Sequence, residues 1–207
     1  MDKHEYWNER YAKKELTWSS GPNTLLESLV AERPAGKALD IATGEGRNAL
    51  WLASRGWRVD AIDFSSVGIE KGKSMAAERN LEVNWITADV CQRVFARAEY
   101  DLVAVVFLHT TADERNIWLP AVIDAVAPGG QFIYIAHDPS NVDHGIGGPQ
   151  DRSLLPGVED VCIELGDFEI LRAEIYERQV GTDPGHGGPA TGVARDSLIS
   201  ARRRAPD

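Results

Sequence analysis

The hydrophobic pattern of the chain alternates between short, continuous apolar runs and longer stretches in which apolar residues follow helical spacing. Continuous runs are typical of buried parallel strands, and helically spaced stretches are typical of the helices that cover them. The runs predict strands at Ala38–Ile41, Trp57–Ile62, Val83–Thr87, Tyr100–Leu108 and Gln131–Ala136. This alternation predicts an α/β fold with a doubly wound, mostly parallel sheet.

Helices are expected between these strands and before the first of them. The pattern predicts helices over 2–13, from Asn23 or Thr24 to about residue 32, over 47–55, from Ser65 or Ser66 to about residue 80, and from Thr111 onward. Pro120 is expected to interrupt the last of these helices, and the Pro-Gly-Gly run at 128–130 to end it. Two later segments, Phe168–Arg178 and about 193–202, have strand character and are joined by a glycine-rich connection.

A glycine turn follows the first predicted strand and opens a helix. Gly44 and Gly46 allow the backbone to turn sharply there and leave N–H groups facing a ligand. The next strand ends in Asp63, which is 19 residues after Gly44. At about this separation an acidic side chain reaches the ribose of an adenosine-containing ligand. Residues 37–63 therefore predict half of a nucleotide-binding fold.

Two carboxylates near the turn bear on the choice of ligand. Asp40 ends the first strand, and Glu45 lies inside the turn. Carboxylates at a helix N-terminus would repel the pyrophosphate of a dinucleotide such as NAD, and would favour the sulfonium and ammonium groups of S-adenosylmethionine. A glycine turn alone is a weak signal, so a turn that binds nothing remains an alternative.

Composition narrows the class further. A chain of 207 residues with 43% hydrophobic content predicts one well-cored domain, and its start, Met-Asp-Lys-His-Glu-Tyr-Trp, lacks the apolar segment of a signal peptide. No run approaches the roughly 18 apolar residues of a membrane helix. We therefore expect a cytoplasmic protein with no membrane partner. The isolated Cys91 and Cys162 predict reduced thiols and no metal site. A net charge of −10 disfavours nucleic acid as partner and leaves a small molecule as the expected substrate.

The pattern Asp40-x-Ala42-x-Gly44-x-Gly46 closely resembles the first motif of class I S-adenosylmethionine-dependent methyltransferases, with Ala42 in place of the first glycine. Residues 6–11 and 18–23 resemble the opening of the small bacterial methyltransferases related to the tellurite-resistance and thiopurine group. The resemblance implies a seven-stranded sheet with an antiparallel C-terminal pair of strands. It also implies a single domain with a helical lid at 1–36, a cofactor core at 37–136, and a substrate-side loop with terminal strands at 137–207.

The resemblance assigns the cofactor S-adenosylmethionine to residues at the ends of the first strands. The backbone at Gly44 and Gly46 would lie along its methionine portion. Asp63 would hold the ribose, and Asp89 would accept a hydrogen bond from the adenine. The full predicted set of cofactor-binding residues is Asp40, Ala42, Gly44, Gly46, Asp63, Phe64, Asp89, Val90 and Trp18.

Two histidines are the candidate catalytic residues. His109 and His137 follow predicted strands at their carboxyl ends, where ligands bind in open α/β sheets, and imidazole titrates near neutral pH. Ordinary structural roles for either residue remain open, and a soft sulfur, selenium or tellurium nucleophile needs no protein base. The prediction is a methyltransferase acting on a small S, Se/Te, N or O nucleophile. The alternatives are an NAD(P)-dependent oxidoreductase and a non-catalytic S-adenosylmethionine-binding module, and the oligomeric state is not predicted.

Overall fold

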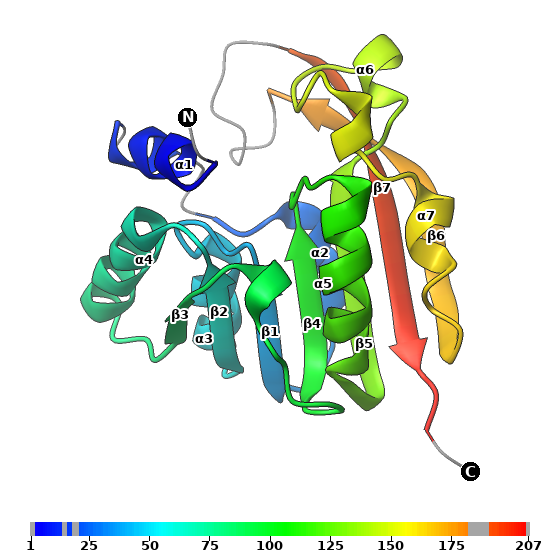
Figure 1. The fold of residues 1–207 in the computed structure, drawn as a ribbon. Helices are drawn as coiled ribbons and strands as arrows, with labels where there is room; N and C mark the ends of the chain where they lie inside the picture. Colours follow the sequence, from blue (N-terminus) through cyan, green and yellow to red (C-terminus); the bar gives the residue numbers. More distant parts are fainter. Residues whose placement is uncertain (1–2, 14–15, 18–20, 182–190, 206–207) are drawn as a thin grey trace.

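One sheet organises the molecule. A computed structural model describes residues 3–13, 16–17, 21–181 and 191–205. Within these residues seven strands form a sheet in the order β3-β2-β1-β4-β5-β7-β6 (Figure 1). The strands are β1 (Lys37–Ile41), β2 (Arg58–Asp63), β3 (Asn84–Thr87), β4 (Tyr100–Val106), β5 (Val126–His137), β6 (Phe168–Val180) and β7 (Gly192–Arg203). The helices are α1 (Lys3–Ala12), α2 (Thr24–Val30), α3 (Arg47–Ser54), α4 (Ser66–Glu78), α5 (Ala112–Asp124), α6 (Asn141–His144) and α7 (Val158–Cys162), with 3-10 turns at Val90–Gln92 and Arg152–Leu154.

Strands β3, β2, β1, β4 and β5 pair in parallel, while β7 runs antiparallel between β5 and β6. The strand order reverses direction beside β1, because the chain moves outward to β3 and then returns to β4. The switch point of an open α/β sheet lies where the order reverses, and ligands bind there at the carboxyl ends of the strands. The predicted doubly wound sheet with an antiparallel C-terminal pair is confirmed.

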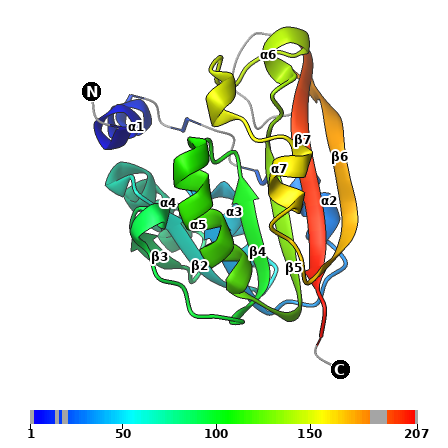
Figure 2. The ribbon, with the colours of Figure 1, turned by 45° about the vertical axis from the view of Figure 1, so that its right-hand side comes forward.

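Helices cover both faces of the sheet (Figure 2). On one face α2 and α3 bury Leu26 and Leu52 against strand residues such as Ala104. On the other face Trp118 of α5 and Val161 of α7 pack against the opposite side of the same strands. Because apolar side chains leave both faces of the central strands, these strands read as continuous apolar runs in the sequence.

The prediction for the helix before β5 was wrong in two respects. Pro120 lies inside α5, and the helix continues past it to Asp124, because its buried face around Trp118 is fixed by packing against the sheet. The segment after the helix, expected to be helical up to residue 128, belongs to β5. Val126 pairs with Tyr100, and the register then shifts so that Gln131 pairs with Leu102. The Pro-Gly-Gly run therefore forms an irregularity in a strand rather than the end of a helix.

The two glycines of α4 allow this helix to lie directly on the glycine turn. A Cβ at Gly68 would be 2.8 Å from the carbonyl oxygen of Gly44, and a Cβ at Gly72 would be 2.5 Å from the ring of Trp85. The same ring would be 2.3 Å from a Cβ at Gly46. This close packing fixes the turn between β1 and α3 from one side.

Candidate functional site

The glycine turn between β1 and α3 has a left-handed backbone at three alternate positions. The φ angles are +55° at Ala42, +59° at Gly44 and +83° at Gly46. The left-handed region costs a non-glycine residue roughly 1–2 kcal/mol, so Ala42 holds local strain where the related motif has glycine. The amide of Thr43 donates to the carbonyl of Ile62, which ties the turn to the end of β2. The predicted turn is therefore present, and it lies at the switch point of the sheet.

Asp63 links the turn to the end of β2. Its Oδ2 accepts a hydrogen bond from the amide of Gly44 at 2.8 Å, and its Oδ1 accepts one from the amide of Ser65 at 2.8 Å. The side chain is buried, and burial raises the pKa of its carboxyl group, opposed by these two amide hydrogen bonds. Each carboxylate oxygen has a second lone pair. Asp63 therefore has acceptor capacity for hydroxyl groups beyond its two bonds to the backbone.

Asp40 lies at the end of β1 beneath the turn. Its Oδ2 accepts a hydrogen bond from the hydroxyl of Thr43 at 2.5 Å, while its buried Oδ1 has no hydrogen-bond partner. Burial raises the pKa of Asp40 to about 7, against the opposing effects of Thr43 and of the charge on Arg47. Burying a carboxylate oxygen without a hydrogen bond costs free energy, and a bound ion, water or ligand commonly supplies the missing partner.

Glu45 has a different role from the one the sequence suggested. Its carboxylate accepts the amide of Thr17 at 2.8 and 3.1 Å and forms an ion pair with Lys71 at 3.0 Å. Lys71 also donates to the carbonyl of Tyr11. The charge of Glu45 is therefore balanced by Lys71 and holds the N-terminal segment, so it does not discriminate between ligands of the turn. Of the two carboxylates on which the charge prediction was based, only Asp40 remains.

Helix α1 lies across the ends of β1, β2 and β3, where the cofactor residues were predicted (Figure 1). The hydroxyl of Tyr11 lies 2.7 Å from the position that a Cβ on Gly44 would occupy. The hydroxyl of Ser65 donates a hydrogen bond to Oδ1 of Asn8 at 2.6 Å. The ring of Phe64 contacts His4 at a centroid distance of 4.6 Å. Phe64 therefore packs against α1 in this structure. The predicted contribution of Trp18 lies outside the described residues.

Asp89 caps the 3-10 turn after β3. Its Oδ1 accepts the amide of Cys91 at 2.9 Å, and its Oδ2 lies 3.5 Å from Nζ of Lys3. Burial tends to raise the pKa of Asp89, but the Cys91 amide and Lys3 outweigh it, so the pKa lies below its usual value. The adjacent Val90 is half-buried against the core. Asp89 is thus an ionised acceptor beside the ends of β2 and β3.

His109 and His137 come together across two strands of the sheet. Their rings stack with centroids 5.4 Å apart and an interplanar angle of 7°. Phe107, which precedes them with a strained φ of +58°, lies 5.1 Å from the ring of His137. Nε2 of His109 is buried without a hydrogen-bond partner. Burial, with a smaller contribution from His137, lowers the pKa of His109 to about 3, so this imidazole is neutral at physiological pH.

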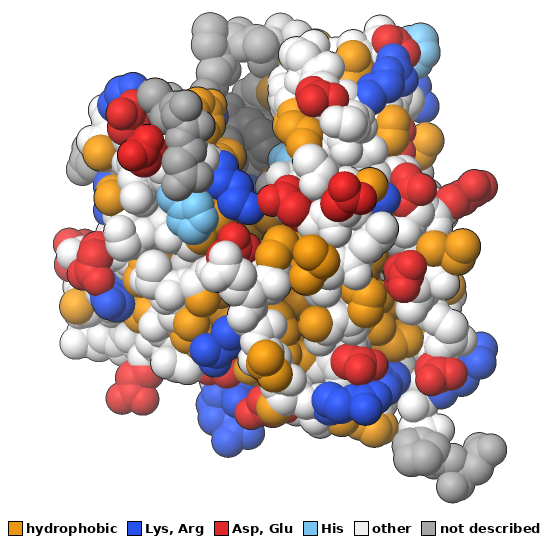
Figure 3. Space-filling model, in the orientation of Figure 1, with side chains coloured by type: hydrophobic (Ala, Val, Ile, Leu, Met, Phe, Trp, Pro, Cys, Tyr) orange, Lys and Arg blue, Asp and Glu red, His pale blue; other side chains and the backbone are white. Residues whose placement is uncertain are grey.

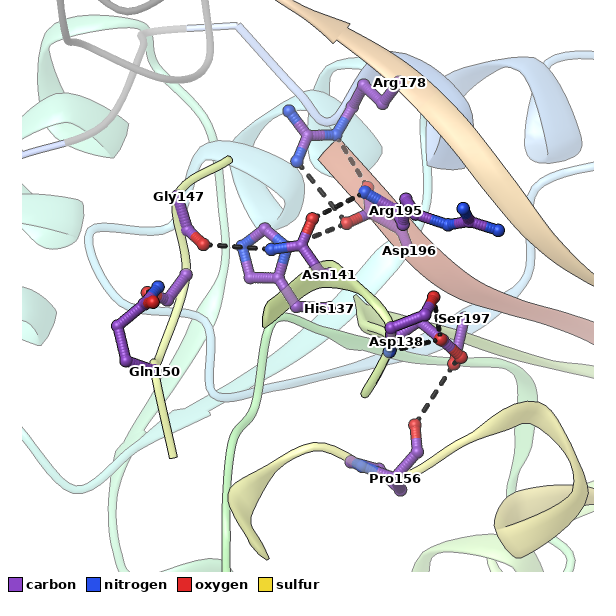
Figure 4. A network of polar contacts seen from close by, with 12 residues as sticks. His137, Asp138, Asn141, Gly147, Gln150, Pro156, Arg178, Arg195, Asp196 and Ser197 are labelled. Carbon is purple, nitrogen blue, oxygen red and sulfur yellow. Dashed lines mark hydrogen bonds and ion pairs between the residues drawn. The ribbon is translucent and has the colours of Figure 1, made fainter. Parts of the chain in front are cut away.

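Asp196 and Arg178 extend this pair in a way that sequence reasoning missed. Nδ1 of His137 lies 3.0 Å from Oδ1 of Asp196, within ion-pair distance but not aligned as a hydrogen bond. Nε of Arg178 donates to Oδ2 of Asp196 at 2.7 Å. Figure 4 shows the carboxylate of Asp196 between the imidazole and the guanidinium. The contact arises from the β5–β7 register, which places His137 opposite Asp196, and the spacing of residues in the sequence carries no signal for that register.

The loop after β5 closes over His137. A Cβ on Gly148, which has a φ of +72°, would be 2.3 Å from Cδ2 of the His137 ring. Asn141 holds this loop by donating to the carbonyl of Gly147 and accepting the amide of Arg195 (Figure 4). The predicted substrate-side loop therefore lies against a candidate catalytic histidine.

In Figure 3 the surface is hollowed between α1 and the region of α6, above the carboxyl end of β4.

The sequence predicts neither a metal site nor a membrane helix. Among the described residues, no group of three or more His, Cys, Asp or Glu side chains is arranged to hold a metal ion. None of the helices in the described part of the chain is long and apolar enough to cross a membrane.

The strand order, the glycine turn at the switch point and the acidic residues ending β1 and β2 define the class I methyltransferase fold. Comparison with known proteins agrees: residues 38–130 match the family described as "Methyltransferase domain". This match covers just under half of the chain and agrees with the expected class of methyltransferase.

Individual relatives have modest sequence identity. The chain is 28% identical to the 2-heptyl-1-hydroxyquinolin-4(1H)-one methyltransferase of Mycobacteroides abscessus over 66% of this chain and 62% of the relative. It is 29% identical to the demethylmenaquinone methyltransferase of Thermus thermophilus over 54% of this chain and 51% of the relative. The chain thus spans between half and two thirds of the length of these relatives. The solved structure of TehB from Haemophilus influenzae is similar in fold, with a TM-score of 0.73 and 17% identity over 98% of this chain and 68% of TehB.

Proposed function

We propose that this protein transfers the methyl group of S-adenosylmethionine to a small-molecule acceptor. The observation that carries the proposal is the arrangement along one edge of the sheet. The glycine turn and Asp63 lie at the ends of β1 and β2, and the histidine pair follows β4 and β5, which are the next strands across. A cofactor half and an acceptor half are therefore adjacent at the switch point.

The residues of the turn fit this cofactor. The unpartnered Oδ1 of Asp40 offers an acceptor to an ammonium group, and Asp63 has lone pairs for the ribose hydroxyls. Asp89 is an ionised acceptor next to the same edge and suits an exocyclic amine. In contrast, the cations beside the turn face carboxylates of the chain, since Lys71 is paired with Glu45 and the charge of Arg47 acts on Asp40. These contacts favour S-adenosylmethionine over a dinucleotide, and thus a methyltransferase over an oxidoreductase.

When bound, S-adenosylmethionine supplies a methyl group on an already activated carbon. The chain then has to align the acceptor with that carbon and exclude water. Phe107, His109 and His137 present rings at the carboxyl ends of β4 and β5, so they suit a flat acceptor that packs against aromatic surfaces. The M. abscessus relative acts, by its name, on a hydroxyquinolone, which is a flat molecule of this kind.

The helical lid and the cytoplasmic location belong to the same proposal. Helix α1 contacts Gly44, Phe64, Ser65 and Asp89 at once, so its displacement would open the cofactor residues to solvent. Both Cys91 and Cys162 are free thiols, which is typical of a reducing compartment.

Isothermal titration tests the proposal directly. S-adenosylhomocysteine, S-adenosylmethionine and NADH are titrated separately into the protein. Binding of the two sulfur compounds without binding of NADH supports the cofactor, and release of S-adenosylhomocysteine in the presence of flat hydroxyl and thiol acceptors supports catalysis. Binding of NADH alone would overturn the proposal. Binding of the cofactor without turnover of any acceptor would favour the non-catalytic binding module.

A further inference from the structure

A row of polar side chains leads away from the cofactor residues along the carboxyl edge of the sheet. His109 follows β4, His137 ends β5, Asp196 lies on β7 and Arg178 lies on β6. These strands are consecutive neighbours in the sheet, and each member of the row contacts the next. The row therefore spans four strands, and the imidazole of His137 lies between the ring of His109 and the buried carboxylate of Asp196.

The carboxylate of Asp196 is fully buried and fixed. Its side chain has no exposed surface, and His137 and Arg178 hold its pKa below the usual range in spite of that burial. Arg178 is itself buried, with its guanidinium 5.4 Å from the centre of the Phe107 ring. A buried carboxylate with one arginine is a neutral pair, and a proton arriving on His137 would find an anion 3.0 Å away.

The position of Asp196 determines which nitrogen of His137 carries the proton. A bare Nδ1 lone pair facing a carboxylate oxygen at 3.0 Å would be repelled, so Nδ1 holds the proton and Nε2 is left bare. An imidazole held in this tautomer by a carboxylate is a general base at Nε2. Within the described structure His109 does not have such a partner, since its Nε2 is buried and unpaired.

We propose that Asp196 and Arg178 are positioning residues that hold His137 as a base, and that the acceptor is therefore a flat hydroxyl compound rather than a thiol or selenide. This inference rests on the proposed methyl transfer and specifies its substrate class. A hydroxyl on a carbon of an aromatic ring is mostly protonated at neutral pH, so its methylation gains from a base. A thiol is already partly ionised and is intrinsically nucleophilic, so it gains little.

The proposed step balances within the site. The O–H bond of the acceptor breaks and its proton passes to Nε2 of His137, while a new bond forms between the oxygen and the methyl carbon. The bond between that carbon and the sulfonium sulfur breaks, and its electron pair stays on sulfur. The positive charge thus moves from sulfur to the imidazole of His137, where the carboxylate of Asp196 stabilises it.

The variant that tests the inference is Asp196→Asn, and the matched control is Asp138→Asn. Asp138 is a second buried carboxylate at the same end of the sheet. It accepts hydrogen bonds from Ser197 and Ser140 and is not in contact with His137 by any described hydrogen bond or ion pair. Both variants are first checked for thermal unfolding and for binding of S-adenosylhomocysteine, which tests the proposed function separately.

The first readout does not need an acceptor. ¹⁵N NMR of the protein with S-adenosylhomocysteine bound, with His137 assigned by loss of its signals in His137→Gln, is expected to show Nδ1 protonated and Nε2 bare. In Asp196→Asn we expect this preference to be lost or reversed, and in Asp138→Asn we expect it to be kept. A bare Nδ1 in the wild-type protein would overturn the inference.

The second readout compares matched acceptors. Initial rates are measured with 2-naphthol and 2-naphthalenethiol, and with 1-naphthol as a second hydroxyl compound. Asp196→Asn is expected to lower kcat for the hydroxyl compounds by roughly 10²-fold or more, and to change the rate with the thiol by less than about 3-fold. Equal losses with both classes, or methylation of the thiol alone, would overturn the inference. Failure of both hydroxyl compounds in a protein that binds S-adenosylhomocysteine would also count against it, whereas failure of that binding would reject the proposed function itself.

Discussion

At the scale of single residues, the site depends on carboxylates that occupy different surroundings at the ends of neighbouring strands. Asp63 is bound by two backbone amides, Asp40 has an oxygen without a partner, and Glu45 is neutralised by a lysine. The three differ in what they are able to offer a ligand. Sequence position alone did not separate Asp40 from Glu45, because the contacts of Glu45 come from an N-terminal segment far from it along the chain.

Replacing Asp63 by Asn is expected to weaken binding of S-adenosylhomocysteine by roughly 10-fold or more. The amide side chain keeps one acceptor oxygen but turns a donor toward the amide of Gly44 or Ser65, which leaves one of these groups unsatisfied and removes the charge-assisted bonds to a ribose. Isothermal titration measures the change. Asp60→Asn, on the same strand but bonded to Tyr100 and Asn84, is the control and should leave the affinity within about 2-fold. Equal effects of the two variants would contradict the assignment of Asp63.

At the scale of elements, the glycine turn packs against two neighbours, α4 and Trp85 of β3. The sequence predicted the helices and strands around the turn well, because the apolar residues of each one follow the spacing typical of that type of element. It failed at α5 and β5, where packing on Trp118 carries a helix past Pro120 and pairing with Tyr100 makes a strand of Val126. Such pairings join residues distant in sequence, which a local pattern does not contain.

The contact between α4 and Trp85 predicts a rescue experiment. Gly72→Ala is expected to destabilise the protein by about 1–3 kcal/mol, because its Cβ would meet the ring of Trp85 at 2.5 Å. In a Trp85→Leu background the additional cost of Gly72→Ala should largely disappear, and denaturant unfolding of the four proteins gives the coupling energy.

Gly46→Ala serves as the comparison for this cycle. Its Cβ would meet the same ring, but Gly46 also has a φ of +83°, so the substitution should keep a cost of about 1–2 kcal/mol even in the Trp85→Leu background, where the facing side chain is smaller. Identical behaviour of the two alanine variants would show that the left-handed backbone at Gly46 adds no cost beyond the contact with Trp85.

At the scale of the whole molecule, stability depends on pH through buried groups whose pKa values move in opposite directions. The pKa of His109 is lowered to about 3 and that of Asp40 is raised to about 7, in both cases chiefly by burial. Each group is neutral in the folded protein over a range where it is charged in the unfolded chain. Between about pH 4 and pH 6.5 the contributions of these two groups to the free energy of unfolding therefore change in opposite directions and offset one another, so each is seen only against a variant that lacks the group.

Acidification is expected to destabilise the protein through His109. Below pH 6.5 the unfolded chain binds a proton at this residue, whereas the folded protein does not until about pH 3, so the free energy of unfolding falls as the pH falls. At pH 4.5 the loss is about 2–3 kcal/mol, or roughly 5–10 °C in Tm. Thermal unfolding of wild-type protein and His109→Gln at pH 7 and pH 4.5 measures it. The Tm of His109→Gln relative to that of the wild-type protein should be higher at pH 4.5 than at pH 7. The same Tm difference at both pH values would contradict the prediction.

Asp40 should show the opposite trend. Between about pH 4 and pH 7 the unfolded chain releases the proton of this carboxyl group while the folded protein retains it, so its contribution to stability falls as the pH rises. The Tm of Asp40→Asn relative to wild type is therefore expected to increase from pH 4.5 to pH 7. Asp101→Asn, a carboxylate outside the site, provides the reference, and a fall in the relative Tm of Asp40→Asn over this range would reject the assignment.

The cofactor half was more predictable from sequence than the acceptor half, and the sheet explains the difference. The turn, Asp63 and Asp89 lie within one continuous stretch whose spacing is set by parallel strands and short helices. The acceptor half combines His109 and His137 with Asp196 and Arg178, and their meeting depends on the register of β7 against both β5 and β6. Spacing in the sequence gives the strand ends but not that register.

The insertion of β7 between β5 and β6 also has a consequence for how the chain folds. Strand β6 pairs only with β7 in the described part of the sheet, so it has no place there until β7 has been synthesised. We expect the parallel half around β1 to become protected from amide exchange first, while residues of β6 remain open. Pairing His137 with Asp196 is then among the late events of folding, and we expect a newly made chain to form the proposed cofactor site before the proposed acceptor site.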